Sequence, residues 1–96
     1  MIIQTVGIIG AGTMGSGIAQ ACAASGIDAV MQDVNEAALE RGLKTVSGSL
    51  DRLVKKGSID EARKLGILSR IRATTRPEDL APVDLVIEAA TENEEL

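Results

Sequence analysis

Residues 6–15 read Val6-Gly7-Ile8-Ile9-Gly10-Ala11-Gly12-Thr13-Met14-Gly15, and this stretch decides the fold. The apolar run over residues 2–9 stops at a glycine, which is typical of a strand buried on both faces. The glycines after it predict a tight turn, and a helix follows with Gly26 as its stop. A strand, a glycine turn and a helix in this order predict the opening of a parallel α/β sheet.

The three glycines of the turn each have a physical purpose in a dinucleotide-binding domain. Gly10 permits the sharp turn, and Gly12 lets the backbone approach a pyrophosphate without a Cβ atom in the way. Gly15, helped by Gly17, lets the helix pack closely on the strand. The helix N-terminus then offers free N–H groups and the positive end of its dipole to phosphates.

An acid at the end of the next strand completes the pattern. A second strand is predicted over residues 27–32, and Asp33 follows it directly. Its carboxylate can accept hydrogen bonds from both hydroxyls of an adenosine ribose and would repel a 2′-phosphate. Val34 and Asn35 provide no cation to relieve that repulsion, so NAD is favoured over NADP. The alternative is a glycine turn with a solvated Asp33 and no ligand.

A long amphipathic helix is predicted over residues 35–56. Asn35 is a good N-cap, and Gly57 ends the helix. Gly42 and Gly48 each weaken it by ~1 kcal/mol relative to alanine. The helix is still favoured because one apolar stripe runs along it, formed by Leu39, Leu43, Val46, Leu50 and Leu53.

The elements after this helix are expected to be short. Ser58 and Glu61 form a capping box for a second helix that runs to about Arg70. Beyond it we expect a strand over residues 71–74, a turn or brief helical piece over 75–78, a strand over 83–90 and a further capping box over 91–94.

Together these elements predict an α/β fold, a Rossmann-like parallel sheet with a helical pair inserted between its second and third strands. No helix follows the capping box over residues 91–94, so the fold is expected to be truncated. We therefore expect residues 1–96 to be an incomplete NAD-binding Rossmann domain. Its C-terminal strands would be absent.

Composition narrows the class of protein. The net charge of −4 leaves no basic face for nucleic acid, and the apolar runs are far too short to span a membrane. The single cysteine, Cys22, cannot form an internal disulfide, which fits a reducing cytoplasm, and we expect it to be a small core residue. Without any Phe, Tyr or Trp, the core must be built from aliphatic side chains.

The sequence resembles the 3-hydroxyacyl-CoA dehydrogenase family, the 3-hydroxybutyryl-CoA enzymes especially. The resemblance is carried by residues 6–20, by residues 84–93 and by the inserted helical pair, which plain Rossmann folds lack. It implies NAD-linked oxidation of a (3S)-3-hydroxyacyl-CoA, of short chain, to the 3-ketoacyl-CoA. In this chemistry a His oriented by a Glu takes the hydroxyl proton.

The resemblance also implies site residues and partners. Ser49 and Lys56 match family positions that contact coenzyme A, whereas on sequence alone a plain solvated helix face would explain them nearly as well. Acyl-CoA is the implied partner, and the full-length parent is expected to be a homo-oligomer. Met14 would also pack beneath the cofactor. The residues implied to hold or approach NAD are Gly10, Ala11, Gly12, Thr13, Met14, Gly15, Asp33 and Glu92.

The chain departs from the family in having no His at all. The resemblance implies that the catalytic His, its Glu partner and a helical dimerisation and substrate domain belong to segments beyond residue 96. No catalytic residue is therefore assigned, and the chain alone is expected to be inactive. Glu88 is expected to support packing or backbone pairing in the last strand. Two alternatives remain: another β-hydroxyacid-type dehydrogenase, against which the long helix argues, and a non-catalytic NAD-binding module, which the missing His favours.

Overall fold

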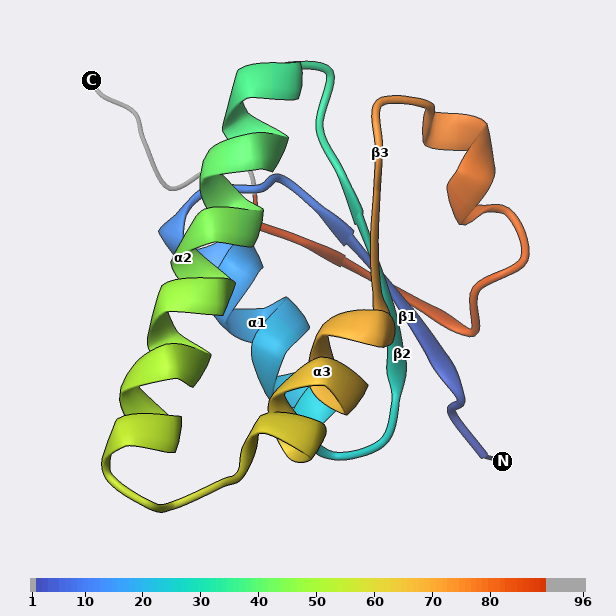
Figure 1. Cartoon of the computed structure of the whole chain (residues 1–96). Helices are drawn as coiled ribbons and strands as arrows, with labels where there is room; N and C mark the ends of the chain where they lie inside the picture. Colours follow the sequence, from blue (N-terminus) through green and yellow to red (C-terminus); the bar gives the residue numbers. More distant parts are fainter. Residues whose placement is uncertain (1, 90–96) are drawn as a thin grey trace.

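The chain folds into a parallel sheet with helices packed on one face. The computed structural model describes residues 2–89 and orders the strands β3-β2-β1-β4, all parallel. Figure 1 shows the three α-helices together on one side of this sheet and the short η1 helix on the other. The fold predicted from the sequence is confirmed. The elements are β1 (Thr5–Ile9), α1 (Thr13–Ala24), β2 (Asp28–Gln32), α2 (Glu36–Lys55), α3 (Glu61–Ser69), β3 (Ile71–Thr74), η1 (Pro77–Leu80) and β4 (Leu85–Glu88).

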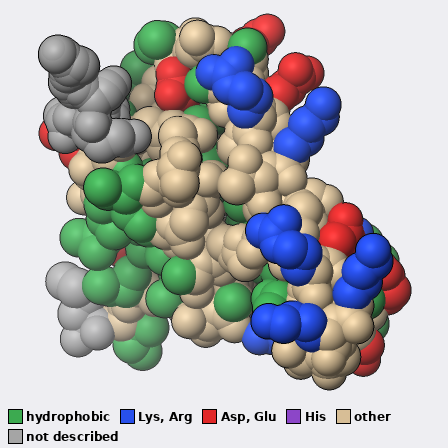
Figure 2. Space-filling view, turned by 90° about the vertical axis from the view of Figure 1, so that its left-hand side faces the viewer, with side chains coloured by type: hydrophobic (Ala, Val, Ile, Leu, Met, Phe, Trp, Pro, Cys, Tyr) green, Lys and Arg blue, Asp and Glu red, His purple; other side chains and the backbone are tan. Residues whose placement is uncertain are grey.

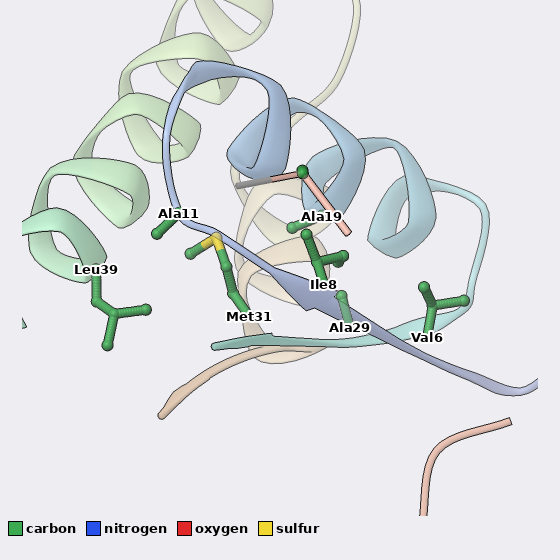
Figure 3. Packing of buried hydrophobic residues seen from close by; sticks show 8 residues of the cluster. Val6, Ile8, Ala11, Ala19, Ala29, Met31 and Leu39 are labelled. Carbon is green, nitrogen blue, oxygen red and sulfur yellow. The ribbon is translucent and has the colours of Figure 1, made fainter. Parts of the chain in front are cut away.

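The core lies between the sheet and the helices and is aliphatic throughout (Figure 3). Alternate residues of the two central strands point toward α1, so that Ile8 of β1 and Met31 of β2 are completely buried. A second cluster joins the three α-helices to one another, with Ala23, Val46, Leu50 and Ile67 as its buried members. The helical pair α2 and α3 is therefore packed onto α1 and is an integral part of the domain.

The long helix follows its predicted stripe. Asn35 caps it, its side chain accepting a hydrogen bond from the Ala38 N–H at 3.1 Å. Three stripe residues are buried (Leu39, Val46 and Leu50), and the other two, Leu43 and Leu53, are half-buried and packed against the clusters. Because the apolar face is used along its whole length, α2 is held in a fixed position over α1.

The predicted capping box at Ser58 is wrong. Gly57 adopts a positive φ of 79°, and the N–H groups of Gly57 and Ser58 donate to the carbonyls of Val54 and Leu53. This is a Schellman motif, so Ser58 belongs to the end of α2. The cap of α3 is instead Asp60, whose carboxylate accepts from the Arg63 N–H at 2.8 Å.

The strands are shorter than the apolar runs predict. β1 begins at Thr5, which is its first residue with a partner in β2, and the N–H groups of Gln4 and Thr5 donate to the Asp84 carboxylate at this end of the strand. β2 begins one residue late because the Ile27 N–H donates to the Cys22 carbonyl in the turn that closes α1. β4 likewise covers only Leu85–Glu88 of the predicted 83–90.

No helix among the described residues is long and apolar enough to cross a membrane. The outer strand β4 is the least covered of the sheet, with Leu85 44% and Val86 47% exposed. The central strands β1 and β2 are buried on both sides of the sheet, because Leu80 of η1 packs over Gly7 on the side away from α1.

Candidate functional site

The glycine turn joins β1 to α1 at the carboxyl edge of the sheet. Gly10 has a φ of 109°, which favours glycine, and its N–H donates to the Gln32 carbonyl at 2.7 Å. A Cβ atom on Gly15 would lie 1.9 Å from the Gly10 carbonyl oxygen. The sequence predicts that Gly15 lets the helix pack closely on the strand, and the close approach is found at Gly10, the residue directly after β1. The predicted help from Gly17 is wrong, because a Cβ atom there would meet nothing within 4 Å.

Asp33 follows β2 directly, as predicted, and is tied to the glycine turn. Its Oδ2 atom accepts a hydrogen bond from the Ala11 N–H at 3.1 Å, and its Oδ1 atom accepts from the Asn35 N–H at 3.0 Å. A carboxylate oxygen has capacity for more than one donor, so both oxygens keep room for a ligand hydroxyl. A hollow of about 150 Å³ lies at this edge, lined by Ile9, Gly10, Gln32, Asp33 and Val34.

The first turn of α1 presents uncapped backbone donors. Gly12 is the N-cap and makes no side-chain hydrogen bond, and the first turn contains no acid. Because the first N–H groups of a helix have no partner within it, those of Thr13 and Met14 are available to a ligand. Gly12, Thr13 and Met14 are all exposed. This donor set fits the phosphates of a dinucleotide.

Met14 is not packed in the core, since 51% of its surface is exposed. Cys22 is a half-buried packing residue of the main cluster, as expected, and burial raises the pKa of its thiol. Glu88 ends β4 and is exposed, so it does not pack in the core. Glu92 lies outside the described residues. Among residues 2–89 no group of His, Cys, Asp or Glu could hold a metal ion.

Ser49 and Lys56 are brought to one place by α2. They line a hollow of about 380 Å³ together with Arg52, Leu53 and Lys55. The Gln20 amide of α1 donates a hydrogen bond to Ser49 Oγ at 3.0 Å, which fixes that hydroxyl. Figure 2 views the molecule from the side on which α2 lies and shows basic side chains gathered at its lower right, toward the carboxyl end of α2.

Gly42 is a site residue that the sequence analysis missed. A Cβ atom on it would lie 2.8 Å from the Ala11 carbonyl oxygen, so α2 packs directly against the glycine turn. The sequence analysis counted Gly42 only as a cost to the helix. Its position three residues after Leu39 and four before Val46 places it on the buried stripe, and that spacing was the signal to use.

Comparison with known proteins agrees with this geometry. The family described as 3-hydroxyacyl-CoA dehydrogenase, NAD binding domain, matches residues 5–96. A 3-hydroxybutyryl-CoA dehydrogenase of Bradyrhizobium diazoefficiens is 47% identical over 95 residues, which cover 99% of this chain and 32% of the relative. A fatty acid oxidation complex subunit alpha of Idiomarina loihiensis is 40% identical over 91 residues, covering 95% of this chain and 13% of the relative.

Solved structures show the same similarity. The crystal structure of (S)-3-hydroxybutyryl-CoA dehydrogenase from Ralstonia eutropha superposes with a TM-score of 0.92 at 56% identity, over 97% of this chain and 33% of that one. The chain thus spans about a third of the length of these dehydrogenases. It belongs to the 3-hydroxyacyl-CoA dehydrogenase family, matching the part of it that binds NAD.

Proposed function

We propose that this chain binds NAD(H) at the carboxyl edge of β1 and β2 and supplies the cofactor site of a 3-hydroxyacyl-CoA dehydrogenase acting on short acyl chains. The observation that carries the proposal is the fixed position of the glycine turn. Asp33 accepts a hydrogen bond from its Ala11 N–H, and Gly15 at the start of α1 packs against its Gly10 carbonyl. Its uncapped N–H groups fit a diphosphate, and the carboxylate beside them fits a ribose.

The residues proposed to hold NAD differ in what they offer. The backbone from Gly10 to Gly15, which includes Ala11, Thr13 and Met14, would bind the diphosphate, and Asp33 would accept hydrogen bonds from the adenosine ribose. Glu92 is proposed to lie near the cofactor by family resemblance alone. When bound, NAD+ supplies the hydride acceptor for oxidation of the 3-hydroxyl group. The chain's own contribution is binding and orientation.

Proton transfer is proposed to depend on residues outside this sequence. The chain contains no His, and Asp33, the acid that lines the hollow at the turn, already accepts hydrogen bonds from two backbone N–H groups and is proposed to bind the ribose. A whole dehydrogenase would add a His, its Glu partner and a helical domain, and we propose a cytoplasmic homo-oligomer. The missing His also favours the second candidate, a module that binds NAD without catalysis.

Titration of the chain with NADH and NADPH tests the cofactor proposal. We expect tighter binding of NADH, because a 2′-phosphate would meet the Asp33 carboxylate. Asp33→Asn should weaken NADH binding and narrow the difference between the cofactors. Glu36→Gln is the matched control, since it removes the same charge three residues away from an exposed position. Equal or tighter binding of NADPH to the unsubstituted chain would contradict the proposal.

The hollow at the end of α2 is proposed to bind the nucleotide end of coenzyme A. Lys56 would act as a mobile point charge for phosphate, and Ser49 Oγ would contribute a hydroxyl held by Gln20. In the whole dehydrogenase, Lys56→Ala should raise the KM for acyl-CoA and leave NAD binding unchanged, whereas a truncated thioester lacking the nucleotide should be insensitive. Lys44→Ala, on the same helix but outside the hollow, is the control. Equal effects on both substrates would show that Lys56 is only structural.

A further inference from the structure

A second hollow lies on the α2 side of the glycine turn. Its volume is about 220 Å³. Because Gly42 packs against the Ala11 carbonyl oxygen, α2 cannot move away from the turn without losing that contact. The residue before it, Arg41, is therefore held next to the backbone that is proposed to bind NAD. The lining residues are Ala11, Gly12, Thr13, Ala38, Arg41, Gly42 and Thr45.

Arg41 is the one cationic residue in the lining of this second hollow. The hollow that Arg41 lines and the hollow beside Asp33 contain no Lys and no other Arg among their lining residues. Arg41 is exposed and makes no ion pair with a carboxylate of residues 2–89. By contrast, Arg70 pairs with Asp28 at 3.0 Å, and Arg63 donates to the Ala24 carbonyl at 2.7 Å.

We propose that Arg41 binds the diphosphate of NAD from the α2 side of the glycine turn, opposite the N–H groups of α1. This inference rests on the NAD-binding function proposed above. A dinucleotide diphosphate carries two negative charges, and a helix N-terminus offers only about half a positive charge. A guanidinium can donate two parallel hydrogen bonds to phosphate oxygens. Arg41 would thus balance charge that the backbone of the turn leaves uncompensated.

The test is the affinity of the purified chain for NADH, ADP-ribose and adenosine, measured with Arg41→Gln, Arg41→Lys and the control Lys44→Gln. Lys44 is exposed on the same helix and lines neither hollow at the turn. We expect Arg41→Gln to weaken the binding of NADH and ADP-ribose about fivefold to tenfold, which lies between the usual effects of an exposed ion pair and of a charged hydrogen bond. Adenosine, which lacks the diphosphate, should bind equally to all variants, and Arg41→Lys should recover part of the loss.

Thermal melting of each variant separates a binding effect from a folding effect. NADH affinity that Arg41→Gln leaves unchanged, or lowers no more than Lys44→Gln does, would overturn the Arg41 subsite alone. If Arg41→Gln weakened the binding of coenzyme A and left the binding of NADH unchanged, the subsite would also be overturned, because the hollow would then bind the diphosphate of coenzyme A. Absence of NADH binding by the unsubstituted chain would instead overturn the proposed function, and the subsite with it.

Discussion

Alanine at Gly15 and alanine at Gly17 are expected to change stability in opposite directions. The two glycines lie two residues apart near the start of α1, and both would gain helix propensity as alanine. They differ in surroundings. A Cβ atom on Gly15 would meet the Gly10 carbonyl oxygen at 1.9 Å and the Gly10 carbonyl carbon at 2.9 Å, whereas one on Gly17 would meet nothing within 4 Å.

The size of the difference follows from these distances. Ordinary contact begins at 3.4 Å, so alanine at position 15 must move helix and turn apart by more than an ångström. The Gly10 atoms that a Cβ atom on Gly15 would meet belong to the backbone, so no side-chain rotation can relieve the clash. Overpacking of this kind costs about 1–3 kcal/mol or more. At position 17 the exposed helix gains about 0.5–1 kcal/mol. Because both variants gain similar helix propensity, they should differ in the free energy of unfolding by the overpacking cost, about 1–3 kcal/mol or more.

Far-ultraviolet circular dichroism suits this measurement. For a domain of this size a change of about 1 kcal/mol moves the Tm by roughly 4–8 °C. We expect Gly17→Ala to melt above the unsubstituted chain by about 2–8 °C and Gly15→Ala to melt below it. If Gly15→Ala melts at the same temperature as Gly17→Ala, the close approach of α1 to the turn does not exist in solution and our account of the turn is refuted.

Three further predictions use the same fold. Gly42→Ala should lower the Tm and weaken NADH binding because the added Cβ atom presses on the Ala11 carbonyl, whereas Gly48→Ala on the same helix should raise the Tm. Thermal melts and NADH titrations of the two variants measure this, and equal effects of both would contradict it. Asp33→Ala should cost about 1 kcal/mol without any nucleotide present, since two backbone N–H groups lose their acceptor, and chemical denaturation that shows no change would contradict this. The chain alone should not oxidise 3-hydroxybutyryl-CoA, because a positioned general base is typically worth ~10²–10⁴-fold in rate, and saturable NAD-dependent turnover by pure chain would disprove the assignment of roles.

The features that sequence predicted well are those determined by local spacing. The glycine turn, the position of Asp33 and the stripe of α2 each follow from a short pattern with one physical reading. The α2 cap at Asn35 and the stop at Gly57 are local in the same sense. These patterns were sufficient to predict a parallel sheet and the helical pair inserted between its second and third strands.

The errors concern contacts between distant segments. Gly17 and Gly42 are both helical glycines, and the packing of α1 and α2 against the turn shows that Gly42 is needed there and Gly17 is not. Ser58 has the sequence of a helix cap, but its N–H is already used by the Schellman motif of α2. Strand ends were too long because hydrophobicity cannot reveal where a neighbouring strand stops pairing.

The order of the strands determines which parts of the domain open first in local unfolding. β1 is paired on both sides, by β2 and by β4, whereas β3 and β4 are each paired on one described side only. Amide hydrogens in such central strands exchange with solvent only through openings that approach global unfolding. The glycine turn is attached to the end of β1 and bonded to the end of β2. Fraying at either outer strand therefore leaves the base of the turn intact, and the cofactor site should be among the last regions to be lost as the domain opens.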